Sequence, residues 1–94
     1  GQRPAPEGRR RVFVDGAEVA LKNNGYELLL FLLSNPDIVF SKETLYERIW
    51  GYDAMGDNAT VVVHINRLRE KIEKDPAHPR YIQTVWGAGY RFKP

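Results

Sequence analysis

The feature that most constrains the fold is a set of apolar residues at helical spacing between residues 59 and 74. Val61, Ile65, Leu68 and Ile72 follow one another at intervals of four, three and four positions. At roughly 100° per residue they fall within about 60° of one another on a helical wheel. A helix with such a stripe buries it, so the sequence predicts a helix over residues 59–74 packed against a core.

The opposite face of this helix is polar and basic, with one valine in it. Val63 points almost directly away from the stripe, one turn before Arg67. Valine can contact the thymine methyl in the major groove, and arginine can donate a forked pair of hydrogen bonds to guanine. The flanking residues Thr60, His64 and Lys71 have side chains suited to phosphates. The plainer interpretation is a solvent-facing surface with one exposed valine.

Two further helices are predicted before this one. In the first, Asn24 is a candidate cap and Glu27 completes a capping box. Residues 28–33 are apolar nearly all round, so this helix should lie in the centre of the domain. The second helix is expected to begin after Ser41, as its cap, and to end at Gly51.

Two β-hairpins are predicted to flank the helices. Residues 12–21 contain two apolar segments around Asp15-Gly16, which is a hairpin signal. Residues 81–92 contain a second pair around a glycine-rich turn that begins with Trp86. A helix followed by a projecting hairpin is how a winged helix meets DNA, the hairpin being the wing. Trp86 then has two interpretations: a side chain of the wing, or a core aromatic packed on the preceding helix.

The length and the distribution of charge favour one domain that contacts a polyanion. The 94 residues suffice for a single domain, which we place at residues 12–94, with residues 1–11 as a linker or disordered N-terminus. The net charge of +2 is uneven, at +3 for residues 1–11, −5 for residues 12–57 and +4 for residues 58–94. A basic C-terminal part on an acidic body suggests that one face contacts a polyanion.

Several classes of protein are disfavoured. The chain has no cysteine, so it has no disulfide, thiol nucleophile or cysteine-ligated zinc, and this favours the cytoplasm. Residues 28–33 form the longest apolar run, far short of the ~20 residues that span a bilayer, so no membrane segment is expected. His64 and His78 lack a nucleophile motif, paired acids or cysteine partners, so we expect no enzyme, metal site or cofactor. The remaining alternative is a winged helix used mainly for protein–protein interaction, which would suit Val63 and Trp86.

Four motifs follow one another along the chain. They are Tyr26-Glu27-Leu28-Leu29, Ile49-Trp50-Gly51, His64-Ile65 followed by Arg67-Leu68-Arg69, and Thr84-Val85-Trp86-Gly87-Ala88-Gly89-Tyr90-Arg91-Phe92. Together they resemble the OmpR/PhoB-type C-terminal effector domain of bacterial two-component response regulators. The resemblance covers residues 12–94. It implies an α+β winged helix-turn-helix, with an N-terminal four-stranded antiparallel sheet, three helices and a C-terminal β-hairpin wing over residues 81–93.

The resemblance also implies a function. Such domains bind double-stranded DNA sequence-specifically and regulate transcription, with the helix over residues 59–74 in the major groove and the wing on the backbone or minor groove. They usually follow a receiver domain, which is absent from these residues. They bind direct-repeat half-sites as tandem dimers, and in activators RNA polymerase is a partner of the loop at residues 51–57.

Individual site residues follow from the same resemblance and from the helical wheel. Base contacts are expected for Val63, Asn66 and Arg67. Backbone contacts are expected for Trp50, Thr60, His64, Arg69, Lys71, Thr84 and Tyr90. The wing contributes Trp86 and Arg91, and the loop that contacts polymerase contains Tyr52, Asp53 and Met55. The chain departs from the family pattern at Ala59, Val62, Asn66 and Trp86, so base preference and wing contacts are not carried over.

Overall fold

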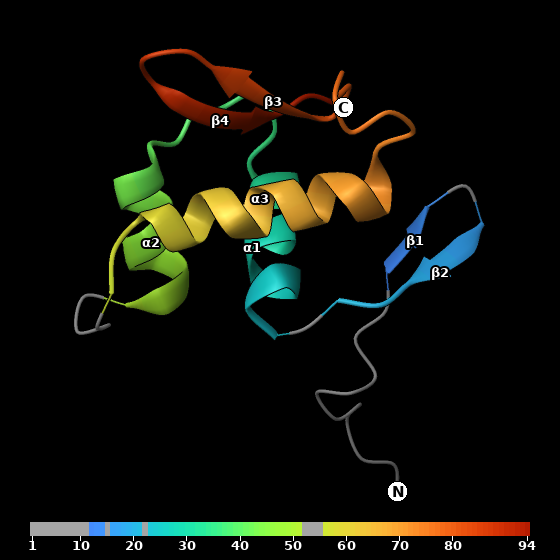
Figure 1. The fold of residues 1–94 in the computed structure, drawn as a ribbon, viewed down its shortest axis with the longest axis horizontal. Helices are drawn as coiled ribbons and strands as arrows, with labels where there is room; N and C mark the ends of the chain where they lie inside the picture. Colours follow the sequence, from blue (N-terminus) through green and yellow to red (C-terminus); the bar gives the residue numbers. More distant parts are fainter. Residues whose placement is uncertain (1–11, 15, 22, 52–55) are drawn as a thin grey trace, which may run out of the picture.

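The computed structural model describes residues 12–14, 16–21, 23–51 and 56–94 of the chain. Three helices are flanked by two small antiparallel sheets, in an α+β winged helix-turn-helix (Figure 1). In chain order the elements are β1 (Val12–Val14), β2 (Ala17–Val19), α1 (Asn23–Ser34), α2 (Lys42–Trp50), α3 (Ala59–Ile72), β3 (Ile82–Val85) and β4 (Gly89–Phe92). The residues expected to form a linker, 1–11, lie outside the described part of the chain.

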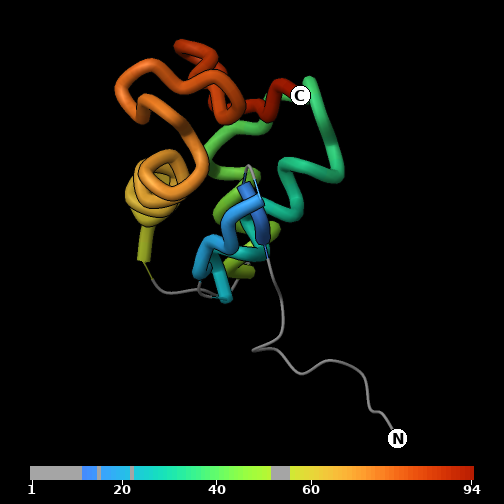
Figure 2. The backbone as a smooth tube through the Cα atoms, turned by 90° about the vertical axis from the view of Figure 1, so that its right-hand side faces the viewer, coloured from blue at the N-terminus to red at the C-terminus, as the bar shows by residue number. Residues whose placement is uncertain are grey.

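Helix α3 lies across α1 and α2, and the β3–β4 hairpin runs along the top of the helices (Figure 1). The view turned by 90° shows α3 end-on, with the β1–β2 hairpin below the β3–β4 hairpin (Figure 2). The predicted stripe of α3 forms the centre of the core, because Val61 and Ile65 are fully buried and Leu68 and Ile72 nearly so. Burial of this stripe fixes which face of α3 is left to solvent.

The ends of α2 are as the sequence predicts. The hydroxyl oxygen of Ser41 accepts a hydrogen bond from the backbone N–H of Thr44 at 3.0 Å. At the other end the N–H of Gly51 bonds to the carbonyl of Glu47, with Gly51 at φ 99°. Glycine adopts this positive φ without steric cost, which explains why the helix ends there.

Two of the other helix boundaries differ from the prediction, the start of α1 and the end of α3, while α3 begins at Ala59 as expected. Helix α1 begins at Asn23, so Asn24, expected as the cap, lies inside the helix. Helix α3 ends at Ile72 rather than at residue 74, because Glu73 turns into extended backbone at φ −89° and ψ 140°. At its start the Asp57 side chain, and not that of Asn58, accepts a hydrogen bond from the N–H of Ala59.

The β3–β4 hairpin is joined to the connection between α1 and α2. Its register pairs Ile82 with Phe92 and Val85 with Gly89. Phe40 and Tyr90 exchange two backbone hydrogen bonds of 2.9 Å, which attach β4 to the segment before α2. Gly89 lies at φ 146°, and a Cβ atom there would collide with the backbone of Phe40. The close approach therefore requires glycine.

The N-terminal sheet is smaller than the resemblance implies. In the described residues before α1 there are two strands, β1 and β2, paired from Val12–Val19 to Val14–Ala17. This matches the single hairpin that the residue pattern predicts, while the four-stranded sheet is not seen within these residues. No helix in the described ranges is long and apolar enough to cross a bilayer.

Candidate nucleic-acid interface

The outer face of α3 is exposed as the helical wheel predicts. Val61 is fully buried, Val62 is intermediate and Val63 is 46% exposed, so the three consecutive valines have different environments. Asn66, Arg67 and Lys71 are exposed on the solvent side of the same helix. Several polar side chains and one apolar side chain therefore face outward, because the buried stripe fixes the orientation of the helix.

A groove runs along one side of this face. It is lined by Ala20, Leu21, Gly25, His64, Arg67, Leu68 and Lys71, which come from the end of the first hairpin, the start of α1 and the middle of α3. Arg67 and Lys71 are one turn apart on its wall. Two adjacent cations beside a groove favour an anionic ligand.

His64 and Trp50 are positioned by their neighbours. The Nδ1 atom of His64 lies 3.0 Å from the carbonyl oxygen of Thr60. The Trp50 ring meets the His64 ring edge-on at 4.9 Å between centroids, and it also stacks on the Tyr46 ring. Because a carbonyl only accepts, the contact with Thr60 favours the tautomer that carries its proton on Nδ1. Trp50 thus supports the His64 ring from α2.

Arg69, Thr84 and Tyr90 meet where α3 joins the hairpin. The Arg69 guanidinium donates hydrogen bonds to the Ile82 carbonyl at 3.0 and 2.9 Å and to the Thr84 hydroxyl at 2.8 Å. It also lies 5.7 Å from the centre of the Tyr90 ring. Burial lowers the pKa of Arg69, while electrostatic interaction with Tyr90 and Glu73 acts in the opposite direction. The structure thus turns these three side chains toward one another, and Tyr90 is only 9% exposed.

The tip of the hairpin presents Trp86 to solvent. Its side chain is 90% exposed, which excludes the interpretation of a core aromatic packed on α3. Arg91 lies further down the hairpin and donates two hydrogen bonds to the Gln83 side chain across the strands, at 3.2 and 3.1 Å. Between the tip and α3 lies a second groove, lined among others by Lys42, Val62 and Trp86.

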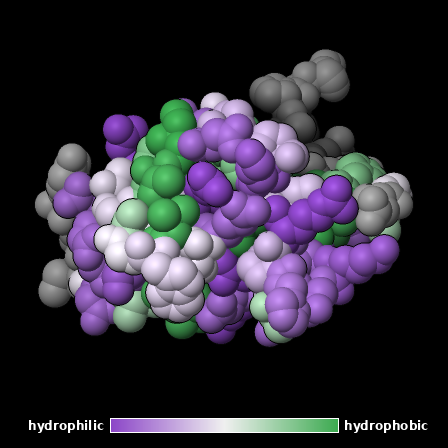
Figure 3. All heavy atoms as spheres, turned by 90° about the horizontal axis from the view of Figure 1, so that it is seen from above, coloured by the Kyte–Doolittle hydropathy of each residue, from purple (hydrophilic) through white to green (hydrophobic). Residues whose placement is uncertain are grey.

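Viewed from the hairpin side, hydrophilic side chains cover much of the visible surface, interrupted by an apolar band (Figure 3). Such a surface suits a polar, charged partner better than a large apolar one. Within the described ranges no group of histidine, aspartate or glutamate side chains is arranged to hold a metal ion. His78 instead lies 3.0 Å from the Asp75 carboxylate, at the surface.

Three expected site residues, Tyr52, Asp53 and Met55, fall outside the described residues. One buried residue, Glu73, belongs to no motif in the sequence. A signal for it exists, because an acidic residue just after a helix is unfavourable for the helix dipole and so needs another partner.

The chain resembles known proteins along nearly its whole length. The family model described as "Transcriptional regulatory protein, C terminal" matches residues 16–92. Transcriptional regulatory protein YvrH of Bacillus subtilis is 51% identical over 83 residues, which cover 88% of this chain and 35% of that protein. ResD of the same organism is 48% identical over 84 residues, again 88% of this chain and 35% of that protein. The chain thus spans about a third of the length of these curated relatives.

Solved structures with the same fold include a response regulator and a DNA-binding domain. DrrB of Thermotoga maritima, an OmpR/PhoB homolog, superposes with a TM-score of 0.83 at 39% identity, covering 89% of this chain and 38% of that one. The DNA-binding domain of RstA from Klebsiella pneumoniae, solved in complex with the RstA box, superposes with a TM-score of 0.78 at 30% identity. That match covers 94% of this chain and 87% of the RstA chain.

Proposed function

Because the chain belongs to the family of transcriptional regulatory protein C-terminal domains, we propose that it binds double-stranded DNA in a sequence-specific manner and regulates transcription. The observation that carries this proposal is the exposure of Val63 and Arg67 on the face of α3 opposite its buried stripe. A helix held in this way fits the major groove, where both residue types recognise bases. The RstA domain complex with DNA supports it by similarity.

Within this proposal the residues divide by role. Val63, Asn66 and Arg67 read bases, and Thr60, His64 and Lys71 contact phosphates. The wing lies on the backbone or minor groove through Trp86 and Arg91. Trp50 acts by supporting His64, since the two rings are in contact. Arg69, Thr84 and Tyr90 contact the backbone of the same stretch of duplex from where α3 joins the hairpin. Arg69 already bonds to Ile82 and Thr84 inside the protein, so phosphate contacts of Arg69 and Thr84 are secondary to these bonds.

The setting of the domain is also part of the proposal. Residues 12–94 form the DNA-binding unit of a longer two-component response regulator, with residues 1–11 as a linker from a receiver domain. Two copies bind direct-repeat half-sites in tandem, RNA polymerase contacts the loop at residues 51–57, and the protein acts in the cytoplasm. It acts by binding rather than by catalysis. Regulators such as YvrH, about three times as long as the matched part, support this arrangement.

The test is selection of bound sequences from a random duplex pool, repeated at two salt concentrations. We expect enrichment of a spaced direct repeat and weaker binding at high salt. Contacts with about four to six phosphates give a log–log salt slope of about −4 to −5. A salt-sensitive interaction without an enriched motif would contradict sequence-specific reading by α3.

The 90% exposure of Trp86 favours one second candidate, a winged helix used mainly to bind another protein. An exposed tryptophan is a typical anchor of protein interfaces. Affinity for a protein partner held by such an anchor would depend only slightly on salt. If the domain did not bind DNA at low salt, the result would therefore favour protein binding over DNA binding.

A further inference from the structure

Glu73 is the one charged side chain that is buried among the residues the structure describes, at 7% exposure. Its carboxylate accepts four hydrogen bonds from three consecutive backbone N–H groups. Oε1 accepts from Arg80 at 2.7 Å and from Tyr81 at 3.2 Å, and Oε2 accepts from Tyr81 at 3.0 Å and Ile82 at 2.8 Å. Such charge-assisted bonds compensate the cost of burying a carboxylate.

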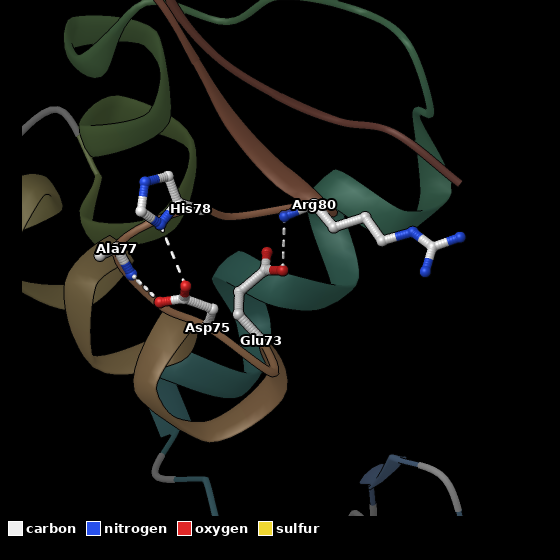
Figure 4. Close-up of polar contacts among 5 residues, drawn as sticks. All are labelled: Glu73, Asp75, Ala77, His78 and Arg80. Carbon is white, nitrogen blue, oxygen red and sulfur yellow. Dashed lines mark hydrogen bonds and ion pairs between the residues drawn. The ribbon is translucent and has the colours of Figure 1, made fainter.

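These bonds connect the end of α3 to the start of the wing. Glu73 follows α3 directly, and the carboxylate reaches across the loop of residues 74–79 to the first residues of the hairpin (Figure 4). The loop itself turns locally, because the Asp75 carboxylate accepts from the N–H of Ala77. Asp75 therefore shapes the loop, whereas Glu73 holds the hairpin.

The orientation of β3 determines which of its backbone groups point toward the end of α3. The N–H of Lys93 donates a hydrogen bond to the carbonyl of Tyr81. The next pair of residues, Ile82 and Phe92, is therefore a non-hydrogen-bonded pair. As a result, the backbone N–H and carbonyl of Ile82 point away from β4. Glu73 accepts from the N–H of Ile82, and Arg69, one turn earlier on α3, donates to its carbonyl. Both backbone polar groups of Ile82 are thus bound by side chains at the end of α3, from Arg69 within the helix and from Glu73 directly after it.

We propose that Glu73 is a positioning residue that sets the direction of the wing relative to α3, so that Trp86 reaches the duplex that α3 reads. The inference rests on the proposed function, because it names the residue through which one part of the DNA interface is aligned with the other. Glu73 does not contact DNA itself. Its effect on DNA binding passes through the wing, at whose tip Trp86 is exposed.

The test compares Glu73→Gln with Asp75→Asn. Each change removes one negative charge from the same loop region, which by itself strengthens binding to a polyanion. We expect Glu73→Gln to weaken binding to the selected duplex by about three- to thirtyfold, because an amide brings an N–H donor among backbone donors. Asp75→Asn is expected to leave affinity unchanged or slightly higher. Glu73→Asp, which keeps the charge but shortens the side chain, should weaken binding in the same direction.

A double-mutant cycle with Trp86→Ala separates positioning from general damage to the fold. If Glu73 acts through the wing, the loss caused by Glu73→Gln should be smaller in the Trp86→Ala background than in the wild type. Losses that multiply in the double variant would overturn the proposal, as would unchanged affinity in Glu73→Gln. Circular dichroism confirms that each variant is folded at the temperature of the binding assay, and Glu73→Asp replaces Glu73→Gln in the cycle if the amide variant is not folded.

A second measurement does not depend on DNA. Residual dipolar couplings of the backbone amides of β3 and β4, taken relative to those of α3, report the direction of the wing in the free protein. We expect this direction to change or to become averaged in Glu73→Asp and to stay the same in Asp75→Asn. An unchanged direction in Glu73→Asp overturns the positioning role even if the wild type binds DNA. A changed direction in a domain that fails to bind DNA overturns the proposed function and the action through Trp86.

Discussion

The Arg69 guanidinium donates two hydrogen bonds to the carbonyl oxygen of Ile82, from Nε at 3.0 Å and from Nη2 at 2.9 Å. The same Nη2 donates to the Thr84 hydroxyl at 2.8 Å. Side chains of α3 thus satisfy polar groups at the outer edge of β3, which an edge strand otherwise leaves open. These bonds attach the β3–β4 hairpin to α3.

Because of these bonds, we expect Arg69→Lys to lower the free energy of unfolding although it keeps the positive charge. An ammonium group cannot reproduce the fork that spans Ile82 and Thr84, so we expect a loss of about 1–2 kcal/mol in the free energy of unfolding. Chemical denaturation measures it. The matched control is Arg67→Lys on the exposed face of α3, which should change stability by less than about 0.5 kcal/mol. Equal effects of the two changes would show that the bonds of Arg69 do not stabilise the domain.

A second prediction concerns the core stripe. Ile65 is fully buried in the centre of α3, so Ile65→Ala should leave a cavity and lower stability by about 2–5 kcal/mol. Asn66→Ala, at the next position on the exposed side, should cost less than about 1 kcal/mol. Thermal denaturation of the two variants distinguishes the faces of the helix. A small loss for Ile65→Ala would mean that the stripe is not the core.

The close approach of Gly89 to Phe40 gives a third prediction. Gly89→Ala combines an unfavourable φ of 146° with a collision against the Phe40 backbone. We expect a loss of at least about 1–3 kcal/mol, or a displaced hairpin. Gly87→Ala is the control, since Gly87 also has a positive φ, of 80°, but a Cβ atom there meets nothing within 4 Å. If Gly87→Ala lowered stability as much as Gly89→Ala, backbone strain at positive φ rather than the contact with Phe40 would be the cause.

A pH dependence follows from the surface pair of Asp75 and His78. Two hydrogen bonds lower the pKa of Asp75 below its ordinary value: the larger effect comes from the His78 side chain and the smaller from the Ala77 backbone. A carboxyl whose pKa is lower in the folded state stabilises that state above its unfolded pKa of about 3.9, and this contribution disappears as the pH falls through the folded value. The melting temperature of Asp75→Asn should thus lie slightly below that of the wild type at pH 6. The gap should close as the pH falls through the lowered pKa of Asp75 in the folded protein, and a gap that is constant with pH would contradict this.

Local sequence patterns predict much of this fold, because helical spacing, helix caps and turn residues act between residues that are close in the chain. The stripe of α3, the Ser41 cap, the stop at Gly51 and both hairpin positions follow from spacing and turn residues. The exposure of Val63 follows from the same wheel. Boundaries set by contacts between distant segments do not follow, which is why α3 ends two residues early, where the Glu73 backbone becomes extended.

The candidate site is predictable in its outward-facing part only. Val63, Asn66, Arg67 and Lys71 are exposed as the helical period requires. The inward turn of Arg69 depends on a carbonyl thirteen positions later in the chain, and no local pattern encodes that distance. The sequence likewise leaves the environment of Trp86 open, since an aromatic beside a turn fits either the core or the surface.

The central claim is that α3 reads DNA bases through its outer face, and Arg67→Ala tests it most directly. Sequence selection should be repeated with this variant and with Arg48→Ala, which removes the same charge from α2, where Arg48 lies over Phe31. We predict that Arg67→Ala loses about 1–3 kcal/mol of affinity for the selected site and relaxes preference at one base pair. Arg48→Ala should retain the motif. An unchanged motif and affinity in Arg67→Ala would contradict the claim.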